Sequence, residues 1–378
     1  MSSKISFVEQ ASRAGANIAE LCRAHGISRQ TGHKWLKRFR ARGYEGLEDH
    51  SRRPRSSPLA TGEEVVAALL AARVARPRWG PRKLAGLLRR QFGAATPSER
   101  TINRVLERFG QVRHRRRRRG LSVVERAPQV TASASNDVWT IDFKGWWRAI
   151  DGTRCEPLTV RDAYSRFVLA LVLLPRARGP EVQAVMTRLF RRHGVPKAIQ
   201  CDNGSPFICT RSPAGLTKLS AWWVSLGIRI VRSRPGCPQD NGGHERMHLD
   251  IAGELQAVPE ATVALQQRAC DRWRQEFNHV RPHDALKGKT PSDVYRPSRS
   301  HLTIRPPVYP PGWLVRKVTH NGQFGDTKDG QFLSTAVAGY FVGLQPLGGL
   351  RHRAWFYDVD LGELELTPSM RVLSRLAS

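Results

Sequence analysis

Apolar positions near the start of the chain follow a helical period. A short helix is predicted from positions at i, i+3, i+4 and i+7, namely Ile18, Leu21, Cys22 and His25. Gly26 ends this helix, and Ser28 can cap a second helix whose apolar side is Trp35, Leu36 and Phe39. Two short helices joined by such a turn predict a helix-turn-helix in residues 1–58, which includes a linker rich in Ser, Pro and Arg at 49–58.

The second predicted helix carries polar residues on the side opposite its apolar face. Side chains near the start of a recognition helix meet base edges in the major groove. The candidate DNA-contacting residues of this module are therefore Arg29, Gln30, His33 and Lys34. A helical hairpin with a solvated basic face is the alternative interpretation.

The same pattern recurs in residues 59–120. Apolar residues fall on one face of each of two further helices, at Leu84, Leu87, Leu88, Ile102, Val105 and Leu106, with a break at 93–97 and a cap at Ser98. Outward-facing candidates for DNA contact are Arg100, Thr101, Asn103 and Arg104. The basic run at 113–119, which includes Arg115, Arg116 and Arg117, can follow phosphates or a minor groove, or can serve as a solvated linker.

The period changes to that of β-structure in residues 121–300. Strands are predicted in VWTIDF at 138–143, TVRDAYSRFVLALVLL at 159–174 and KAIQCDNG at 197–204, with a helix at 181–193. This region is expected to form an α/β core. In residues 301–378, five short alternating runs separated by Gly, Asn and Asp predict a small β-barrel.

Charge and composition narrow the class of function. The 378 residues contain 62 Lys plus Arg and 32 Asp plus Glu, a formal net charge of +30. Such a balance favours nucleic acid as the partner and a membrane surface less strongly. The longest apolar run, 167–174, is far shorter than the ~20 residues of a membrane span, and no secretory signal is visible, so a cytoplasmic, nucleoid-associated protein is expected. The six cysteines lack close pairs, which predicts reduced thiols without a zinc site.

Three acidic residues from separate segments are candidates for a metal site. Asp142 lies inside a predicted strand, Asp202 follows the end of another, and Glu245 lies in the first turn of a helix predicted at 243–255. Each alone has an ordinary explanation as a turn or capping residue. If they converge on one sheet edge, their mutual repulsion favours bound Mg²⁺ or Mn²⁺, and two such ions are the usual arrangement for phosphodiester chemistry.

These motifs resemble a known family. WTIDF, CDNGSPF and RPGCPQDNGGHE, in this order, resemble the catalytic core of DDE transposases and retroviral-type integrases, which have an RNase H-like fold. The segment 277–295, FNHVRPHDALKGKTPSDVY, is similar to the one that follows the catalytic glutamate helix in bacterial insertion-sequence transposases. The resemblance implies a multidomain enzyme, with helix-turn-helix modules before the core and a small barrel after it.

The resemblance also implies roles for matching residues. Asp142 would bridge two Mg²⁺ ions, while Asp202 and Glu245 would each hold one. Water would first be activated to cut the ends of a mobile element, and the freed 3′-hydroxyls would then attack target DNA. The 42 residues between Asp202 and Glu245 exceed the usual interval, with 209–218 as the extra loop, so Asp250 is the alternative third ligand and Glu254 a weaker one.

The segment after the core matches the family motif at four positions. Their role is interpreted as DNA contact or core support, and they are Asn278, Arg281, Pro282 and His283. The family further implies binding to terminal inverted repeats and an oligomer on DNA, whereas the need for an accessory ATPase is left undetermined.

Two other functional classes remain as alternatives. The first is a catalytically silent, sequence-specific DNA-binding regulator, although such a protein has no physical reason to keep three repelling carboxylates. The second is a recombinase with a covalent Ser or Tyr intermediate, for which no convincing nucleophile stands out.

Several other residues have structural interpretations that are preferred to functional ones. Asp162 is expected in a turn between two strands, and His244 in a structural role. Packing is favoured over base stacking for the two tryptophan pairs, 146–147 and 222–223.

Overall fold

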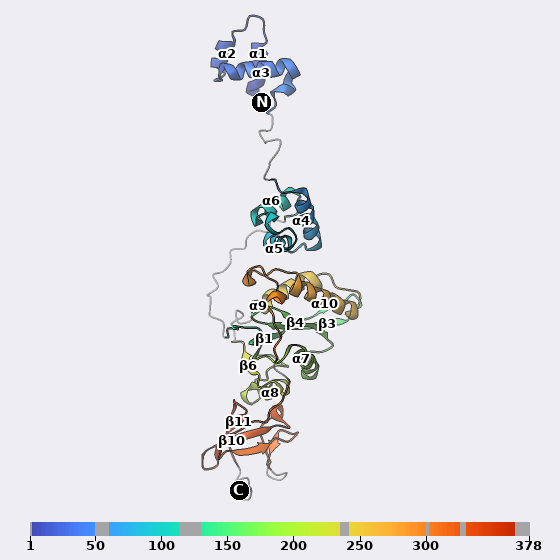
Figure 1. Ribbon diagram of the computed structural model, residues 1–378, viewed down its shortest axis with the longest axis vertical. Coiled ribbons are helices and arrows are strands. Elements are labelled where there is room, and N and C mark those ends of the chain that lie inside the picture. Colours follow the sequence, from blue (N-terminus) through green and yellow to red (C-terminus); the bar gives the residue numbers. More distant parts are fainter. Residues whose placement is uncertain are drawn as a thin grey trace. The chain divides into compact units, whose positions relative to one another are not determined.

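The computed structural model describes residues 2–49, 60–112, 130–234, 242–299, 302–325 and 330–366. The chain divides into two compact units, Met1–Gly62 and Glu63–Ser378 (Figure 1). The predicted domain boundaries at residues 58, 120 and 300 lie outside the described residues. None of the helices described is long and apolar enough to cross a membrane.

The first unit contains the predicted helix-turn-helix and one further helix. Its elements are α1 (Ser2–Ala11), α2 (Ile18–Ala24), α3 (Arg29–Arg42) and a 3₁₀ helix (Gly43–Leu47). Gly26 has a φ of +64° in the turn, and the Ser28 side chain accepts a hydrogen bond from the Thr31 amide at 3.2 Å. A Cβ at Gly32 would lie 2.5 Å from Cys22 Sγ and 2.8 Å from Phe7 Cζ, so this glycine lets α3 approach its neighbours.

The second helical module begins the second unit. It consists of α4 (Glu63–Ala75), α5 (Pro81–Phe92), a 3₁₀ helix (Gly93–Ala95) and α6 (Glu99–Arg108). Its core is apolar and includes Leu69, Trp79, Leu84, Leu88, Ile102 and Leu106. Ser98 caps α6 by accepting from the Thr101 amide at 3.2 Å, as the sequence predicts.

A six-stranded mixed sheet forms the centre of the second unit. Its strands are β1 (Val138–Phe143), β2 (Trp147–Arg148), β3 (Arg154–Asp162), β4 (Val168–Leu174), β5 (Ala198–Cys201) and β6 (Arg229–Arg232). The order is β2-β3-β1-β5-β6, and β4 pairs with β3. Strands β5 and β6 run parallel to β1, whereas β3 runs antiparallel to it. The predicted α/β core is therefore present.

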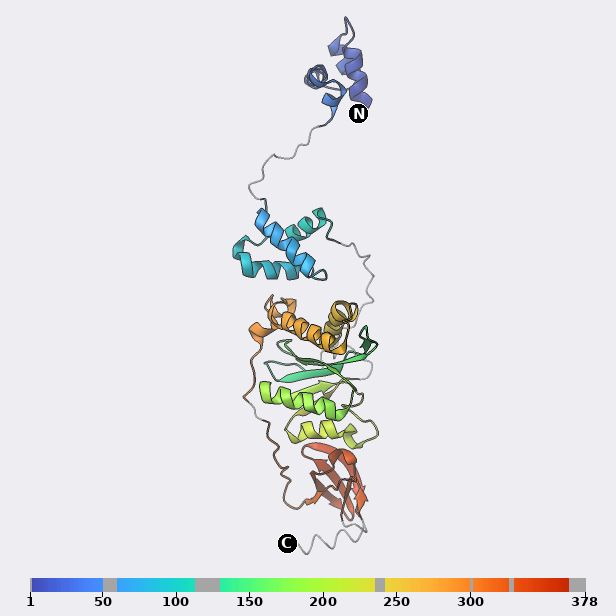
Figure 2. The ribbon, with the colours of Figure 1, turned by 90° about the vertical axis from the view of Figure 1, so that its right-hand side faces the viewer.

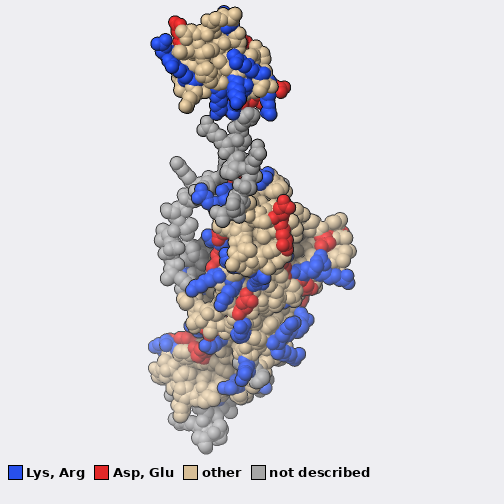
Figure 3. Space-filling model, turned by 45° about the horizontal axis from the view of Figure 1, so that its top comes forward, with Lys and Arg blue, Asp and Glu red and all other residues tan. Residues whose placement is uncertain are grey.

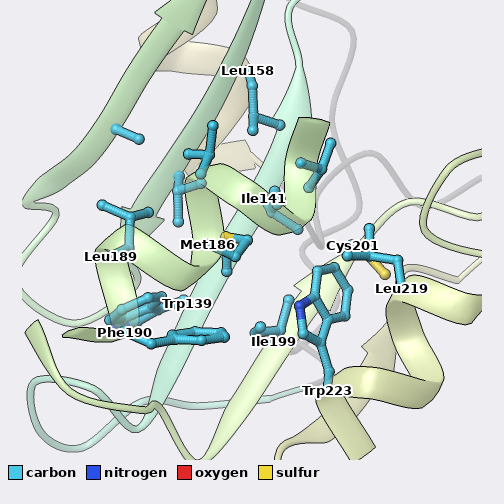
Figure 4. Packing of buried hydrophobic residues seen from close by; sticks show 14 of the residues in the cluster. Trp139, Ile141, Leu158, Met186, Leu189, Phe190, Ile199, Cys201, Leu219 and Trp223 are labelled. Carbon is cyan, nitrogen blue, oxygen red and sulfur yellow. The ribbon is translucent and has the colours of Figure 1, made fainter. Parts of the chain in front are cut away.

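Helices cover both faces of this sheet. One face carries α7 (Gly179–His193) and α8 (Lys218–Ser225), and the other carries α9 (Gly242–Ile251), a π-helical turn (Ala252–Gln256) and α10 (Val263–His279) (Figure 2). On the first face, Trp139 and Ile141 of β1 pack with Phe190 of α7 and Trp223 of α8 (Figure 4). Burial of this apolar surface stabilises β1 and β5, and the candidate acids lie at the carboxyl ends of these two strands.

The C-terminal region departs from the prediction of a small barrel. Its four-stranded sheet has the order β12-β11-β10-β7, and β8 pairs separately with β9. The strands are β7 (Leu314–Lys317), β8 (Gln323–Phe324), β9 (Gln331–Phe332), β10 (Phe341–Gly348), β11 (Arg351–Phe356) and β12 (Val359–Glu365). Within the residues described, these sheets do not close. One reason is that β9 stops early, because Ser334 caps a 3₁₀ helix at Thr335–Val337.

The C-terminal sheet packs on the α/β core through the predicted extra loop. Leu216, Ala221 and Val224 share one apolar cluster with Phe324 and Phe356. The Ser212 hydroxyl also lies 3.1 Å from the Ser334 hydroxyl. The 209–218 loop therefore contributes to the contact between the core and the C-terminal sheet.

Candidate active site and DNA-contacting surfaces

Asp142 and Asp202 extend from neighbouring parallel strands. The register between β1 and β5 pairs Val138 with Ala198 and Thr140 with Gln200. Two residues beyond the last of these pairs lie Asp142, still within β1, and Asp202, the first residue after β5, so both acids belong to the carboxyl ends of neighbouring parallel strands. Carboxyl ends of parallel strands are where α/β folds commonly place their ligand sites.

Besides burial, the charges of Asp202 and Asp142 both raise the pKa of the Cys201 thiol. Burial raises the pKa of Cys201 to about 12, and the negative charges of Asp202 and Asp142 raise it too, while Arg232 opposes them. Both carboxylates therefore act electrostatically on one buried atom between the two strand ends. Asp202 also accepts a hydrogen bond from the Gly204 amide at 3.2 Å, which holds the turn that follows β5.

Glu245 lies in the first turn of α9, and its side chain is exposed. The neighbouring residues His244 and His248 attach this helix to the sheet. Nε2 of His244 lies 3.0 Å, and Nε2 of His248 2.9 Å, from the Thr159 hydroxyl. That hydroxyl donates to the backbone oxygen of Asp142 at 2.9 Å. Thr159 thus joins the helix of Glu245 to the strand of Asp142.

Both histidines are held in the neutral form. Burial, followed by the charge of Arg161, lowers the pKa of His244 well below its usual value. Burial and the charges of Lys144 and Arg161 lower the pKa of His248 to about 4. The Thr159 hydroxyl donates its proton to the backbone oxygen of Asp142. The hydroxyl oxygen therefore accepts a hydrogen bond from each of the two histidine rings. The structural role predicted for His244 agrees with this contact.

The two alternative third ligands are engaged elsewhere. Asp250 and Glu254 both bind the guanidinium of Arg281, which is fully buried, and the Asp250 contact measures 3.3 Å. Glu254 also accepts from Trp273 Nε1 at 2.6 Å. Removing either carboxylate would leave a buried arginine undercompensated, so their positions suit a structural network.

The donors at this sheet edge suit a hard cation. Asp142 and Asp202 supply carboxylate oxygens, the ligands that Mg²⁺ and Mn²⁺ prefer. Among the residues that the structure describes, no group of three or more His, Cys, Asp or Glu side chains is arranged so that it could hold a metal ion. Glu245 therefore does not form a metal-binding group with the two aspartates, and residues 235–241, which precede α9, lie outside the described residues.

The recognition helices present most of the predicted DNA-contacting residues. Arg29, Gln30, His33 and Lys34 of α3 are all exposed. On α6, Arg100 and Arg104 are exposed, and Thr101 and Asn103 are half-buried. Asn103 donates to Glu107 at 2.7 Å, which orients its amide along the helix. Arg115, Arg116 and Arg117 lie outside the described residues.

The post-core residues make internal contacts. Asn278 is buried and bonds the edge strand β4, with its amide oxygen 2.8 Å from the Val168 nitrogen and its amide nitrogen 2.9 Å from the Val168 oxygen. Burial, then the charges of Lys83 and Arg281, lower the pKa of His283 to about 3. Together with the buried Arg281, these contacts correspond to the core-support interpretation.

Other sequence expectations can be compared directly. Asp162 is buried and is the last residue of β3, directly before the predicted turn to β4, and it accepts from the Asn136 and Ser165 amides at 2.7 Å each. Trp147, Trp222 and Trp223 are buried, as packing requires, whereas Trp146 is half-exposed. Arg154 lies over the Trp146 ring, 4.9 Å from its centroid.

One basic surface was missed by sequence reasoning. A cleft of about 520 Å³ opens between α5 and residues 282–293. Its lining includes the basic residues Arg82, Arg89, Arg90, Lys287 and Lys289 and the acidic residues Glu99, Asp284 and Asp293, so basic side chains are in excess. Because these residues lie about 200 positions apart in the sequence, no local pattern could have grouped them. Lys and Arg are also widespread on the face of the molecule in Figure 3.

Comparison with known protein families gives matches for both the helical modules and the α/β core. Residues 132–238 and 226–291 match two integrase core domain models, residues 3–55 match a helix-turn-helix domain, and residues 31–106 match a homeodomain-like domain. An uncharacterized 31.7 kDa protein of insertion element IS407 from Burkholderia multivorans is 29% identical over 285 residues, which cover 74% of this chain and 92% of the relative. These matches support a DDE transposase of bacterial insertion-sequence type. The family resemblance predicted from the sequence motifs is thereby confirmed.

Further similarities extend across most of this chain. An uncharacterized 39.2 kDa protein of insertion element IS476 from Xanthomonas euvesicatoria is 26% identical over 73% of this chain and 77% of its own length. Among solved structures, the HTLV-2 integrase catalytic core domain in complex with magnesium is 16% identical with a TM-score of 0.35, covering 44% of this chain and all of that one.

Proposed function

We propose that this transposase cleaves DNA at the ends of its element and joins the 3′-hydroxyl ends to target DNA, using Asp142, Asp202 and Glu245. The observation that supports the proposal is the parallel pairing of β1 with β5, whose carboxyl ends carry Asp142 and Asp202, together with the adjacent helix that bears Glu245. Contacts of Asp250 and Glu254 with Arg281 favour Glu245 as the third acid.

The residues that would hold the metal are these three carboxylates. Bound Mg²⁺ ions would supply charge neutralisation and activation of the attacking and leaving oxygens. Asp142 lies within β1 and Asp202 directly follows β5, so the sheet positions the backbone of both residues before DNA arrives. Glu245, on the first turn of α9, would move toward them from the adjacent helix.

DNA recognition is assigned to the helical modules. The exposed residues of α3 and α6 would contact base edges and phosphates of the terminal repeats. The basic cleft beside α5 would contact the backbone, because Arg89, Lys287 and Lys289 line it. Joining two DNA ends in one event requires two chains, so the active form is proposed to be an oligomer on DNA.

The test is a strand-transfer assay with purified protein, Mg²⁺, labelled element ends and a supercoiled target. Joined products with the wild type, and none with Asp202→Ala, are expected. Specific end binding by the wild type without cleavage in Mg²⁺ or Mn²⁺ would contradict the proposal and favour a DNA-binding regulator.

A further inference from the structure

The second helical module contacts the core through the end of α10 and the segment that follows it. Three ion pairs link these parts within the described residues, at 3.5, 3.1 and 3.0 Å respectively: Arg76–Glu276, Arg82–Asp284 and Arg90–Asp293. In each pair the arginine belongs to the module and the carboxylate to the core. When all the arginines lie on one surface and all the carboxylates on the other, the charge pairs fix the relative orientation of the two surfaces more than they raise the affinity between them.

A buried layer lies between the charged pairs. Trp79 of the module is 1% exposed, and the Arg281 guanidinium carbon lies 5.5 Å from its ring centroid. Val280 packs against the module's apolar cluster. This contact therefore has a desolvated centre with a charged rim, as specific protein interfaces do.

The helix α5 approaches the core closely at one glycine. A Cβ at Gly86 would lie 2.8 Å from Cγ and 2.9 Å from Cβ of Pro282. No side chain fits there unless the two parts separate. Arg90 also donates to the backbone oxygen of His279 at 3.1 Å, which fixes α5 against the end of α10.

Arg281 extends the contact to the helix of the proposed third acid. Its guanidinium binds Asp250 of α9 and Glu254 of the π-helical turn, while its flat face covers Trp79. Asp250 lies on the same helix as Glu245. One buried side chain thus bridges the second recognition module and the catalytic helix.

We propose that the segment 276–293 is a dock that fixes the second helix-turn-helix module, and with it the DNA end bound by α6, at a set distance from the carboxylates. The dock determines where the strand is cut. Trp79, Gly86, Arg281 and Pro282 are its positioning residues. The positioning role rests on the proposed function, whereas the docking itself does not.

Two sets of full-length variants test the dock. Gly86→Leu should separate α5 from Pro282, and Gln91→Leu, at an exposed position of the same helix, is its matched control. Arg82→Glu should repel Asp284, and the double variant Arg82→Glu/Asp284→Arg should restore attraction. Both residues of this pair are mostly exposed, so the exchange leaves the core intact.

The first measurement is hydrogen–deuterium exchange without DNA, in peptides covering α5 and residues 280–290. Faster exchange in both peptides is expected for Gly86→Leu and Arg82→Glu, with wild-type exchange in Gln91→Leu and the double variant. Unchanged exchange in Gly86→Leu, or no recovery in the double variant, would overturn the dock.

The second measurement maps cut positions on labelled element ends at single-nucleotide resolution. For Gly86→Leu, cutting at the wild-type position should fall on the order of 100-fold, because a small misplacement of substrate is enough for such a loss. Binding of the end should persist through α3 and α6. Wild-type cutting despite faster exchange would overturn the positioning role. Absence of cutting by the wild type would count against the proposed function, while the exchange data would still decide the dock.

Discussion

At the scale of single residues, the Thr159 hydroxyl is the most constrained polar group near the candidate site. It donates to the Asp142 backbone and accepts from two neutral histidines of α9. All of its hydrogen-bonding capacity is used. This arrangement could not be predicted from the sequence, because Thr159 carries no motif and its partners lie 17, 85 and 89 residues away.

Replacing Thr159 with Val should lower end cleavage and the free energy of unfolding. The substitution removes the acceptor of two buried donors, at a cost of about 1–3 kcal/mol for each group left unsatisfied. Thr159→Ser keeps the hydroxyl and should retain most activity. Urea unfolding and single-turnover cleavage check both effects, and equal cleavage by the Val and Ser variants would contradict the role of the hydroxyl.

The carboxylates show what sequence reasoning could and could not decide. The sequence predicted Asp142 inside one strand and Asp202 directly after another, and the structure has these two strands, β1 and β5, as parallel neighbours. The choice between Glu245 and Asp250 depends on Arg281, which lies 31 residues beyond Asp250 and binds it. A one-dimensional pattern could not show that this arginine turns inward.

At the scale of elements, helices with local signals were predicted well. Ser28 and Ser98 cap α3 and α6 as expected, because a cap depends only on a few neighbouring residues. The predicted small barrel is not confirmed, because the described sheets do not close and closure depends on pairing between distant strands. The runs that form β10, β11 and β12 were recognised, but β7 and β12 remain edges of an open sheet.

The N-terminal cap of α6 gives a prediction for DNA recognition. Ser98→Ala should cost about 1 kcal/mol of stability and weaken end binding, because the first turn of α6 loses its side-chain acceptor. Ser98→Asn can still cap the helix and should bind nearly as the wild type does. Urea unfolding and a binding titration check this, and an Ala variant as stable and tight as the Asn variant would refute it.

At the scale of the whole molecule, the excess of basic residues should make DNA binding strongly dependent on salt. The log–log slope is expected to be about −0.9 for each phosphate neutralised. Lys287→Gln/Lys289→Gln should make the slope shallower by about two units if both lysines contact phosphates, as proposed for the cleft beside α5.

Binding titrations between low and moderate salt measure this slope. Arg272→Gln, at an exposed position of α10 outside the cleft lining, is the control. An unchanged slope in the double lysine variant would remove the cleft from the DNA path.

Buried neutral histidines should make the fold sensitive to acid. Burial, then the charges of Arg192 and Arg274, lower the pKa of His193 to about 4, and that of His283 is lowered to about 3. In the unfolded chain histidine titrates near ~6.5, so the unfolded state binds more protons below that pH. The contribution of the neutral histidines to the free energy of unfolding is complete above pH ~6.5. It is lost as the pH falls toward the pKa values of the folded state.

The urea midpoint should therefore be lower at pH 5 than at pH 7. His193→Gln/His283→Gln should show a smaller difference between the two pH values. Equal midpoints for the wild type at both pH values would contradict the neutral state of these histidines.

The central claim is that Asp142, Asp202 and Glu245 form one metal-dependent cleavage site. Single-turnover cleavage of a labelled element end in Mg²⁺ tests it most directly, with Asp142→Asn, Asp202→Asn, Glu245→Gln and Asp250→Asn compared and end binding measured on the same samples. The first three variants should bind the end and not cut it, while Asp250→Asn should retain cleavage in proportion to its folded fraction. Cleavage by any of the first three, or its specific loss in well-folded Asp250→Asn, would contradict the assignment.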